Sequence, residues 1–225
     1  MSYERIESRF VAHTDKGEVS SLMIRPHGAK WLLVLGHGAS TDMRHRNMQA
    51  IAESLADAMV ATFRYNHPYM ECGGGRDARG VTLATVHAAC EAAHSAAPRL
   101  KLLAGGHSFS GRMTSHATAE DTLPHVRGIV FFAFPLHPAG RPGTERADHL
   151  AEVEVPMLFL SGTRDNLARL DLLQPVCEGL GGRATLHLID TADHGYRILK
   201  RSRSSNEDVY TEMARVLTEW VEKLA

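Results

Sequence analysis

Short apolar runs recur along the chain and alternate with segments whose apolar residues have helical spacing. A run that is apolar throughout predicts a strand buried on both faces of a parallel sheet, because crossover helices cover both faces of such a sheet. The segments with this pattern are residues 31–35, 61–65, 100–104, 128–134, 157–161 and 184–188. The alternation of strands and helices predicts an α/β fold.

Helical spacing is clear in three places. Residues 48–59 carry apolar side chains three or four positions apart, which predicts an amphipathic helix. The alanine-rich residues 78–97 predict a second helix that ends before Pro98. Ser204 and Glu207 predict a capping box at the start of the last helix. The apolar face of that helix consists of Val209, Met213, Val216, Leu217, Trp220, Val221 and Leu224.

Two further strands open the chain as a predicted hairpin. Residues 5–12 and 19–25 flank the turn-forming side chains of residues 14–17. With the six apolar runs they predict an eight-stranded, mostly parallel sheet with helices on both faces. The chain has no internal repeat and no low-complexity linker, so we expect a single domain over residues 1–225.

Composition narrows the class of protein without naming a reaction. The 225 residues are 44% hydrophobic and 23% charged, which is typical of a globular chain rather than a disordered one. Lysine and arginine number 25 against 26 acidic residues, a net charge of −1, so we expect no nucleic-acid partner. No apolar run approaches the roughly 18 residues that span a membrane, so we expect no membrane partner.

The segment around Ser108 carries the clearest chemical signal. A predicted strand runs into Gly105 and Gly106, and a predicted helix follows the serine. This order is typical of a nucleophile elbow, in which a sharp turn exposes the serine Oγ. Ser110 stands where the motif prefers glycine, so we expect the helix to lie slightly farther from its neighbour. His107 is expected to point away from Ser108 and to be a packing residue. The alternative is a glycine-rich turn that Ser108 only caps.

A serine hydroxyl needs a base to take its proton, and the base needs an acid to orient it. His194 lies between the last predicted strand and the last helix, and Asp165 follows the end of another predicted strand. Both loops lie at the carboxyl edge of a parallel sheet, so we predict that Ser108, His194 and Asp165 form a catalytic triad. Asp190 and Asp193 are rival acids, because they lie close to His194 in the sequence.

The loop after the first buried strand predicts the rest of an oxyanion hole. A His-Gly turn lets the backbone approach a substrate closely, so we expect the N–H groups of Ala39 and Phe109 to bind the oxyanion. The side chains expected to contact the substrate at this edge are His37, Ser40, His67 and Tyr69. His37 is also expected to fix the loop rather than act as a base. An aromatic loop that only covers the core is the alternative for residues 65–70.

The sequence has no pattern for a cofactor or a metal ion. It contains no HExxH and no cluster of ligand residues at a repeated spacing. A dinucleotide fingerprint starting at Gly36 fails, because Thr41 stands where a glycine is needed. Its 3 cysteines include no CxxC pair, which favours neither a disulfide framework nor a zinc site. We therefore expect no cofactor, no metal and a cytoplasmic location.

Taken together, these motifs resemble the α/β-hydrolase superfamily over nearly the whole chain, and most of all its small, capless, dienelactone-hydrolase-like group. The matching segments are residues 37–39, 64–70, 106–112, 134–142, 162–165 and 193–195. The resemblance implies an eight-stranded α/β-hydrolase fold without a large cap, a triad of Ser108, His194 and Asp165, and hydrolysis of an acyl bond. Two positions depart from the group: Ser110 replaces a glycine, and Ser108 stands where dienelactone hydrolases proper have cysteine.

We therefore predict a serine hydrolase, monomeric or homodimeric, that cleaves a carboxylic ester or related acyl bond of a small-molecule substrate. Residues 135–155, where larger relatives insert a lid, are too few to build one. An open site is expected, bordered by residues 40–46, 66–79 and 136–147. The alternatives are a non-catalytic scaffold or binding protein with this fold, and a thioesterase or acyltransferase that uses the same triad.

Overall fold

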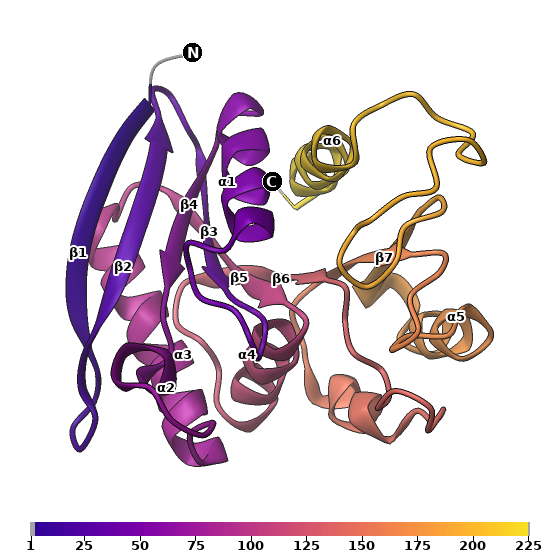
Figure 1. Ribbon diagram of the computed structural model, residues 1–225. Helices are drawn as coiled ribbons and strands as arrows, with labels where there is room; N and C mark the ends of the chain where they lie inside the picture. Colours follow the sequence, from indigo (N-terminus) through magenta and orange to yellow (C-terminus); the bar gives the residue numbers. More distant parts are fainter. Residues whose placement is uncertain (1–2, 225) are drawn as a thin grey trace.

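One sheet of eight strands organises the chain (Figure 1). The computed structural model describes residues 3–224, and the strand order is β1-β2-β4-β3-β5-β6-β7-β8. The strands are β1 (Tyr3–His13), β2 (Gly17–Pro26), β3 (Trp31–Gly36), β4 (Val60–Tyr65), β5 (Lys101–His107), β6 (Val126–Phe132), β7 (Met157–Gly162) and β8 (Ala184–Ile189). Strand β2 pairs antiparallel with β1 and β4, and every other pair is parallel. The predicted hairpin and the mostly parallel sheet are confirmed.

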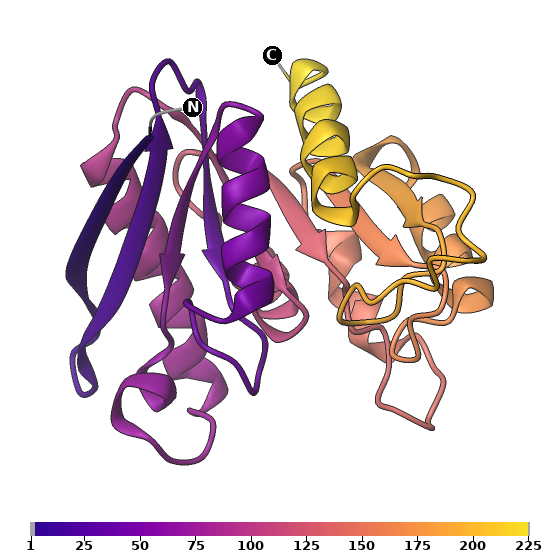
Figure 2. The ribbon, with the colours of Figure 1, turned by 45° about the horizontal axis from the view of Figure 1, so that its top comes forward.

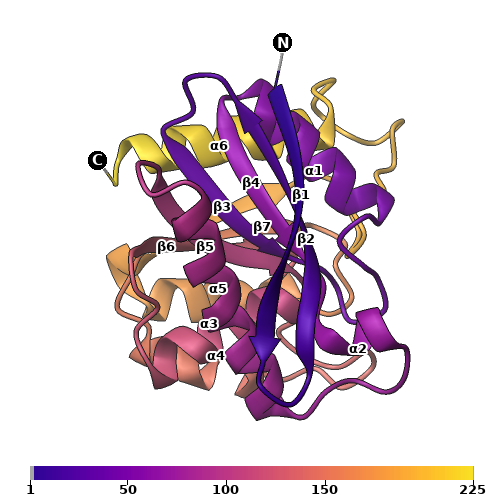
Figure 3. The ribbon, with the colours of Figure 1, turned by 90° about the vertical axis from the view of Figure 1, so that its left-hand side faces the viewer.

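Helices cover both faces of this sheet (Figures 1 and 2). The α-helices are α1 (Arg46–Asp57), α2 (Pro68–Cys72), α3 (Arg79–Ala96), α4 (Phe109–Glu120), α5 (Leu170–Gly179) and α6 (Val209–Glu222), and the 3-10 helices are η1 (Glu145–Glu152) and η2 (Gly181–Arg183). Helices α1 and α6 pack on one face, and α3 and α4 pack on the other. Figure 3 shows the β1–β2 hairpin at the edge of the sheet.

Strand β3 shows why the buried strands are apolar throughout. Leu33 and Leu35 contact the layer of α1 and α6, whereas Leu32 and Val34 contact the layer of α3 and α4. Because side chains alternate along a strand, a strand between two helical layers buries every position. The six residues of β3 are all buried.

Two predicted helix ends are wrong. Helix α1 ends at Asp57, and Met59 lies in the following turn with φ 62° and 39% exposure. The cap of α6 is Asp208, whose carboxylate accepts hydrogen bonds from the first turn. Ser204 instead contacts Asp190, and Glu207 pairs with Arg215, so the predicted capping box does not form.

The parallel strands all end at one edge of the sheet, where the loops with the predicted chemical residues meet. The loop after β5 holds Ser108, the loop after β7 holds Asp165, and the loop after β8 holds His194. Within residues 3–224, no helix has the length and apolar character needed to cross a membrane.

Candidate active site

Ser108 occupies the tight turn between β5 and α4. Its backbone has φ 50° and ψ −107°, an unfavourable region for a residue with a side chain, and its N–H donates to the carbonyl oxygen of Phe132 at 2.8 Å. Gly105 is required before this turn, because a Cβ there would lie 2.9 Å from the carbonyl carbon of Val130. The strand packing thus fixes the strained turn that exposes the serine side chain.

His194 lies between Ser108 and Asp165. Its Nε2 is 2.8 Å from the Oγ of Ser108, and its Nδ1 is 2.8 Å from Oδ2 of Asp165. The side chain of Asp165 is fully buried, and its other oxygen accepts the N–H of Leu167 at 2.8 Å. A buried carboxylate needs such partners, and it holds the Nδ1 proton so that the Nε2 lone pair faces the serine hydroxyl.

The two rival acids have other partners. Oδ2 of Asp190 accepts hydrogen bonds from the N–H and Oγ of Ser204. Oδ1 of Asp193 accepts the N–H groups of Gly195 and Arg197, which shapes the loop that carries His194. Neither carboxylate contacts the imidazole, so Asp165 alone of the three acids is its hydrogen-bond partner.

The predicted oxyanion donors come from two separate segments of the chain. Phe109 is the first residue of α4, where an N–H has no acceptor within its own helix. Ala39 lies in the loop after β3, and the hydroxyl of Tyr69 donates to its carbonyl oxygen at 3.0 Å. That hydrogen bond fixes the plane of the peptide between Ala39 and Ser40.

Ser110 joins these two parts of the site. Its Oγ donates to the carbonyl oxygen of His37 and lies 2.8 Å from Nε2 of His67. Gly36 and Gly106 leave room for this side chain, and the expectation that α4 lies farther from its neighbour stays a prediction. A Cβ on Gly36 would lie 2.7 Å from the Oγ of Ser110, and a Cβ on Gly106 would lie 2.8 Å from its Cβ.

The four predicted substrate contacts differ in exposure. Ser40 is exposed, and Tyr69 keeps 6% of its surface. His37 and His67 are fully buried, and the N–H of His67 donates to Nε2 of His37 at 3.1 Å. Burial lowers the pKa of both histidines, so they pack as neutral rings. In this arrangement neither ring has a surface to offer a substrate, and both instead hold the loop behind the site.

The packing of Ser110 against glycine gives a testable prediction. Gly36→Ala should lower the free energy of unfolding by about 1–3 kcal/mol, because the new Cβ overpacks this contact. Adding Ser110→Gly to that variant should recover part of the loss, measured by urea denaturation of both single variants and the double variant. Gly80→Ala is the matched control, because nothing lies within 4 Å of its added Cβ. Strictly additive effects would contradict the proposed contact.

His107 contacts the backbone of His194, and this contact was not predicted from the sequence. Its Nε2 is 3.1 Å from the carbonyl oxygen of His194, and the two rings lie 5.5 Å apart. Since Nε2 donates to this carbonyl, His107 supports the backbone of the residue that contacts Ser108. Its position directly before the serine was the available signal, although the partner comes from a distant loop.

The environment of His107 predicts how stability depends on pH. Burial, with a contribution from nearby His194, lowers the pKa of His107 from 6.5 to about 4. Between these values the unfolded chain binds a proton that the folded chain does not, so stability should fall as pH is lowered from 6.5 toward 4. The contribution is up to about 3 kcal/mol.

Urea denaturation at pH 7 and pH 5 measures this effect. The variant His107→Gln should lose less stability over this range than the wild type. His27→Gln removes an exposed histidine and should keep the wild-type slope. Equal slopes for all three proteins would contradict the assignment to His107.

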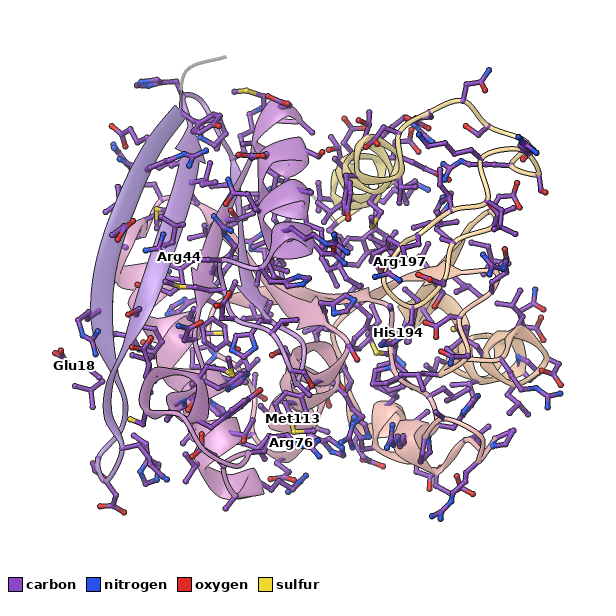
Figure 4. All side chains as sticks on the ribbon, viewed as in Figure 1. Glu18, Arg44, Arg76, Met113, His194 and Arg197 are labelled. Atoms are coloured by element: carbon purple, nitrogen blue, oxygen red, sulfur yellow. The ribbon has the colours of Figure 1, made fainter. Side chains whose placement is uncertain are left out.

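A cavity of about 540 Å³ lies beside His194. Arg46, Arg164 and Arg197 line it, together with Asp193. Figure 4 shows Arg197 and His194 close to each other at this end of the molecule. The site is therefore bordered by positive charge although the whole chain carries a net charge of −1. These arginines were not predicted from the sequence, where the available signal was that Arg164 and Arg197 lie in loops after strands and Arg46 begins α1.

A metal site is not formed by the described part of the chain. Among residues 3–224, no group of three or more histidine, cysteine, aspartate or glutamate side chains could hold a metal ion. The polar groups around Ser108 instead contact one another through hydrogen bonds.

Comparison with known proteins agrees with this fold. The profile of a family described as an alpha/beta hydrolase domain matches residues 29–222. The chain belongs to the α/β-hydrolase family. Among solved structures, this α/β hydrolase is similar to a dienelactone hydrolase from Anabaena variabilis, with 18% identity, 99% of each chain covered and a TM-score of 0.77.

Two further solved structures show the same fold. XC6422 from Xanthomonas campestris, described as a serine hydrolase without a lid, is 16% identical, with 99% of this chain and 96% of the other covered and a TM-score of 0.73. Est1E from Butyrivibrio proteoclasticus is 14% identical, with 97% and 98% covered and a TM-score of 0.70. The predicted fold class and resemblance are confirmed.

Proposed function

We propose that this α/β hydrolase is a serine hydrolase that cleaves a carboxylic ester or a related acyl bond of a small molecule. The observation that carries the proposal is the unbroken hydrogen-bonded line from Ser108 through His194 to Asp165, with two distances of 2.8 Å. A serine held at a strained turn in contact with an oriented imidazole is the arrangement that acyl transfer requires.

The proposed reaction begins with attack by Ser108. Its Oγ forms a bond to the acyl carbon as Nε2 of His194 takes the hydroxyl proton, and the carbonyl electron pair moves onto the oxygen. The N–H groups of Ala39 and Phe109 stabilise that oxyanion. The buried carboxylate of Asp165 stabilises the imidazolium ion that forms.

The second half of the reaction returns the enzyme to its starting state. The tetrahedral intermediate collapses, the bond to the leaving alcohol breaks, and His194 gives its proton to that oxygen. Water then attacks the acyl group on Ser108 as His194 takes a proton from it. The bond from the acyl carbon to Oγ breaks, His194 returns the proton to Oγ, and the acid is released. Protons and electron pairs balance over the cycle without any further reactant.

The surroundings of the site favour small substrates. Between β6 and β7 the only regular element is the short helix η1, which leaves no separate cap over Ser108. Two of the similar structures are described as a dienelactone hydrolase and a serine hydrolase without a lid. These descriptions support an ester-type substrate that reaches an open site.

Hydrolysis of a chain-length series of p-nitrophenyl esters, from acetate to octanoate, tests this function. We expect turnover above the uncatalysed rate, with preference for the short esters because the site is open. A matched thioester series decides whether the natural bond is an ester or a thioester. Absence of turnover on both series would contradict the proposal and favour a non-catalytic protein.

A further inference from the structure

A half-buried guanidinium group lies one turn after Ser108 without an acidic partner. The backbone N–H of Arg112 donates to the carbonyl oxygen of Ser108 at 3.2 Å. Its side chain has no ion-pair partner within residues 3–224, and its recorded contact is with Nε2 of His116 at 3.3 Å. By contrast, several other arginines pair with a carboxylate, among them Arg5, Arg9, Arg25, Arg169 and Arg215.

His116 cannot accept hydrogen bonds from both of the arginines that contact its ring. A guanidinium nitrogen of Arg79 lies 3.2 Å from Nδ1 of the same ring, opposite the contact with Arg112. A neutral imidazole has only one acceptor nitrogen, so it can accept from only one of these two arginines. Only one of the two guanidinium groups can therefore donate to His116, and of the two only Arg79 also has a carboxylate partner, Glu120, within residues 3–224.

Repulsion between cations acts on the same group. Burial lowers the pKa of Arg112, and the nearby guanidinium groups of Arg146, Arg76 and Arg79 lower it further. Burying a charge among like charges is unfavourable unless an opposite charge compensates it. Such local conflicts in a folded protein are expected at functional or strained sites.

These arginines border a cavity beside the candidate active site. The cavity is about 270 Å³ in volume and is lined by Arg76, Arg79, Arg112 and the proposed oxyanion residue Phe109. Arg76 also lies over the ring of Phe109, 5.9 Å from its centroid. Figure 4 shows Arg76 close to Met113, which lines the same cavity. The cavity is thus adjacent to the turn that presents Ser108.

The acidic groups near this cavity are already engaged. Asp77 lines it, but its carboxylate pairs with Lys16 at 3.1 Å and accepts the N–H of Tyr69 at 2.8 Å. Glu120 pairs with Arg79 at the outer side. After these pairs, Arg76 and Arg112 are the cavity-lining arginines that have no carboxylate partner within residues 3–224, so the cavity keeps an excess of positive charge.

We propose that this cavity binds an anionic group of the hydrolase's substrate, either a carboxylate or a phosphate. The proposal rests on the function proposed above. Planar guanidinium groups match the two oxygens of such an anion and form charge-assisted hydrogen bonds with it. The anion would supply the acceptors that His116 lacks and would hold the substrate beside Ser108. The substrate class is then an acyl compound with an anionic group near the scissile bond.

The first test compares a charged ester with its neutral counterpart. Mono-p-nitrophenyl glutarate carries a free carboxylate, and its methyl ester has the same chain without the charge. For the wild type we expect kcat/KM to be roughly 10-fold or more higher for the charged ester, as charge-assisted hydrogen bonds would give. Arg112→Gln should bring the ratio of the two values close to 1. An equal ratio in wild type and variant would overturn the proposal.

Control variants separate this effect from general loss of charge or of fold. Arg99→Gln removes an exposed arginine at the opposite end of β5 and should keep the wild-type ratio. Arg76→Gln changes an exposed side chain, and it is the second test variant if Arg112→Gln does not fold. It should also lower the ratio, and an unchanged ratio in Arg76→Gln would count against the site.

The second test measures binding without catalysis. Calorimetric titration with inorganic phosphate and, separately, with glutarate should show binding to the wild type that Arg112→Gln weakens at least 10-fold. The tighter of the two anions identifies the group that the substrate carries. If the anions bind but no ester is hydrolysed, the proposed function fails and the anion site stands. If esters are hydrolysed but neither anion binds, the anion site fails alone.

Discussion

Ser108→Ala should lower kcat for p-nitrophenyl acetate by on the order of 10⁶-fold, the loss seen when the serine nucleophile is removed from a comparable triad. The variant keeps His194 and the oxyanion donors but has no atom that can form the acyl-enzyme. Residual turnover would come only from water activated in the site and from transition-state binding. Steady-state kinetics with the short ester measure the loss.

The control for this prediction is structural as well as kinetic. Ser108→Ala removes one oxygen at a partly exposed turn, so the thermal unfolding midpoint should change by only a few degrees. Ser95→Ala, an exposed serine on α3, should keep the wild-type kcat. A Ser108→Ala protein that folds and retains kcat within 10-fold of the wild type would show that another residue performs the attack.

Asp165→Asn should lower kcat by about 10⁴-fold while leaving the fold intact, as in a serine protease triad. The asparagine amide would donate to Nδ1 of His194 in place of accepting from it. The imidazole proton would then lie on Nε2, facing Ser108, and the ring could not take the hydroxyl proton. The amide also could not stabilise an imidazolium ion as the carboxylate does.

The matched control for Asp165 is Asp190→Asn. Asp190 is close to His194 in the sequence, but its carboxylate contacts Ser204. Its kcat should stay within about threefold of the wild type, since surface substitutions rarely act on a distant site. A loss in Asp190→Asn as large as that in Asp165→Asn would contradict the assignment of the acid.

Much of the fold could be predicted because burial on both faces marks a central strand. The runs at residues 31–35 and 157–161 differ by one residue from β3 and β7. The positions of Ser108, Asp165 and His194 could be predicted because parallel strands end at one edge. The hydrogen bonds between them depend on loops more than 25 residues apart, and only the three-dimensional structure provides those distances.

Features that depend on tertiary contacts could not be predicted. Ser204 and Glu207 have the capping-box spacing, but Asp190 and Arg215 take their side chains. His67 resembles a pocket residue in sequence, yet the contact with Ser110 buries it completely. The arginines around Arg112 come from separate segments, around the start of α3 and in η1, which meet α4 only in the folded chain.

The most direct test of the central claim is covalent labelling with a fluorophosphonate, followed by mass spectrometry of the digested protein. An activated serine attacks the phosphorus, displaces fluoride and retains the phosphonyl group. The account predicts a single adduct on the peptide that contains Ser108, and loss of that adduct in His194→Gln. An unlabelled wild-type protein, or an adduct confined to another residue, would contradict it.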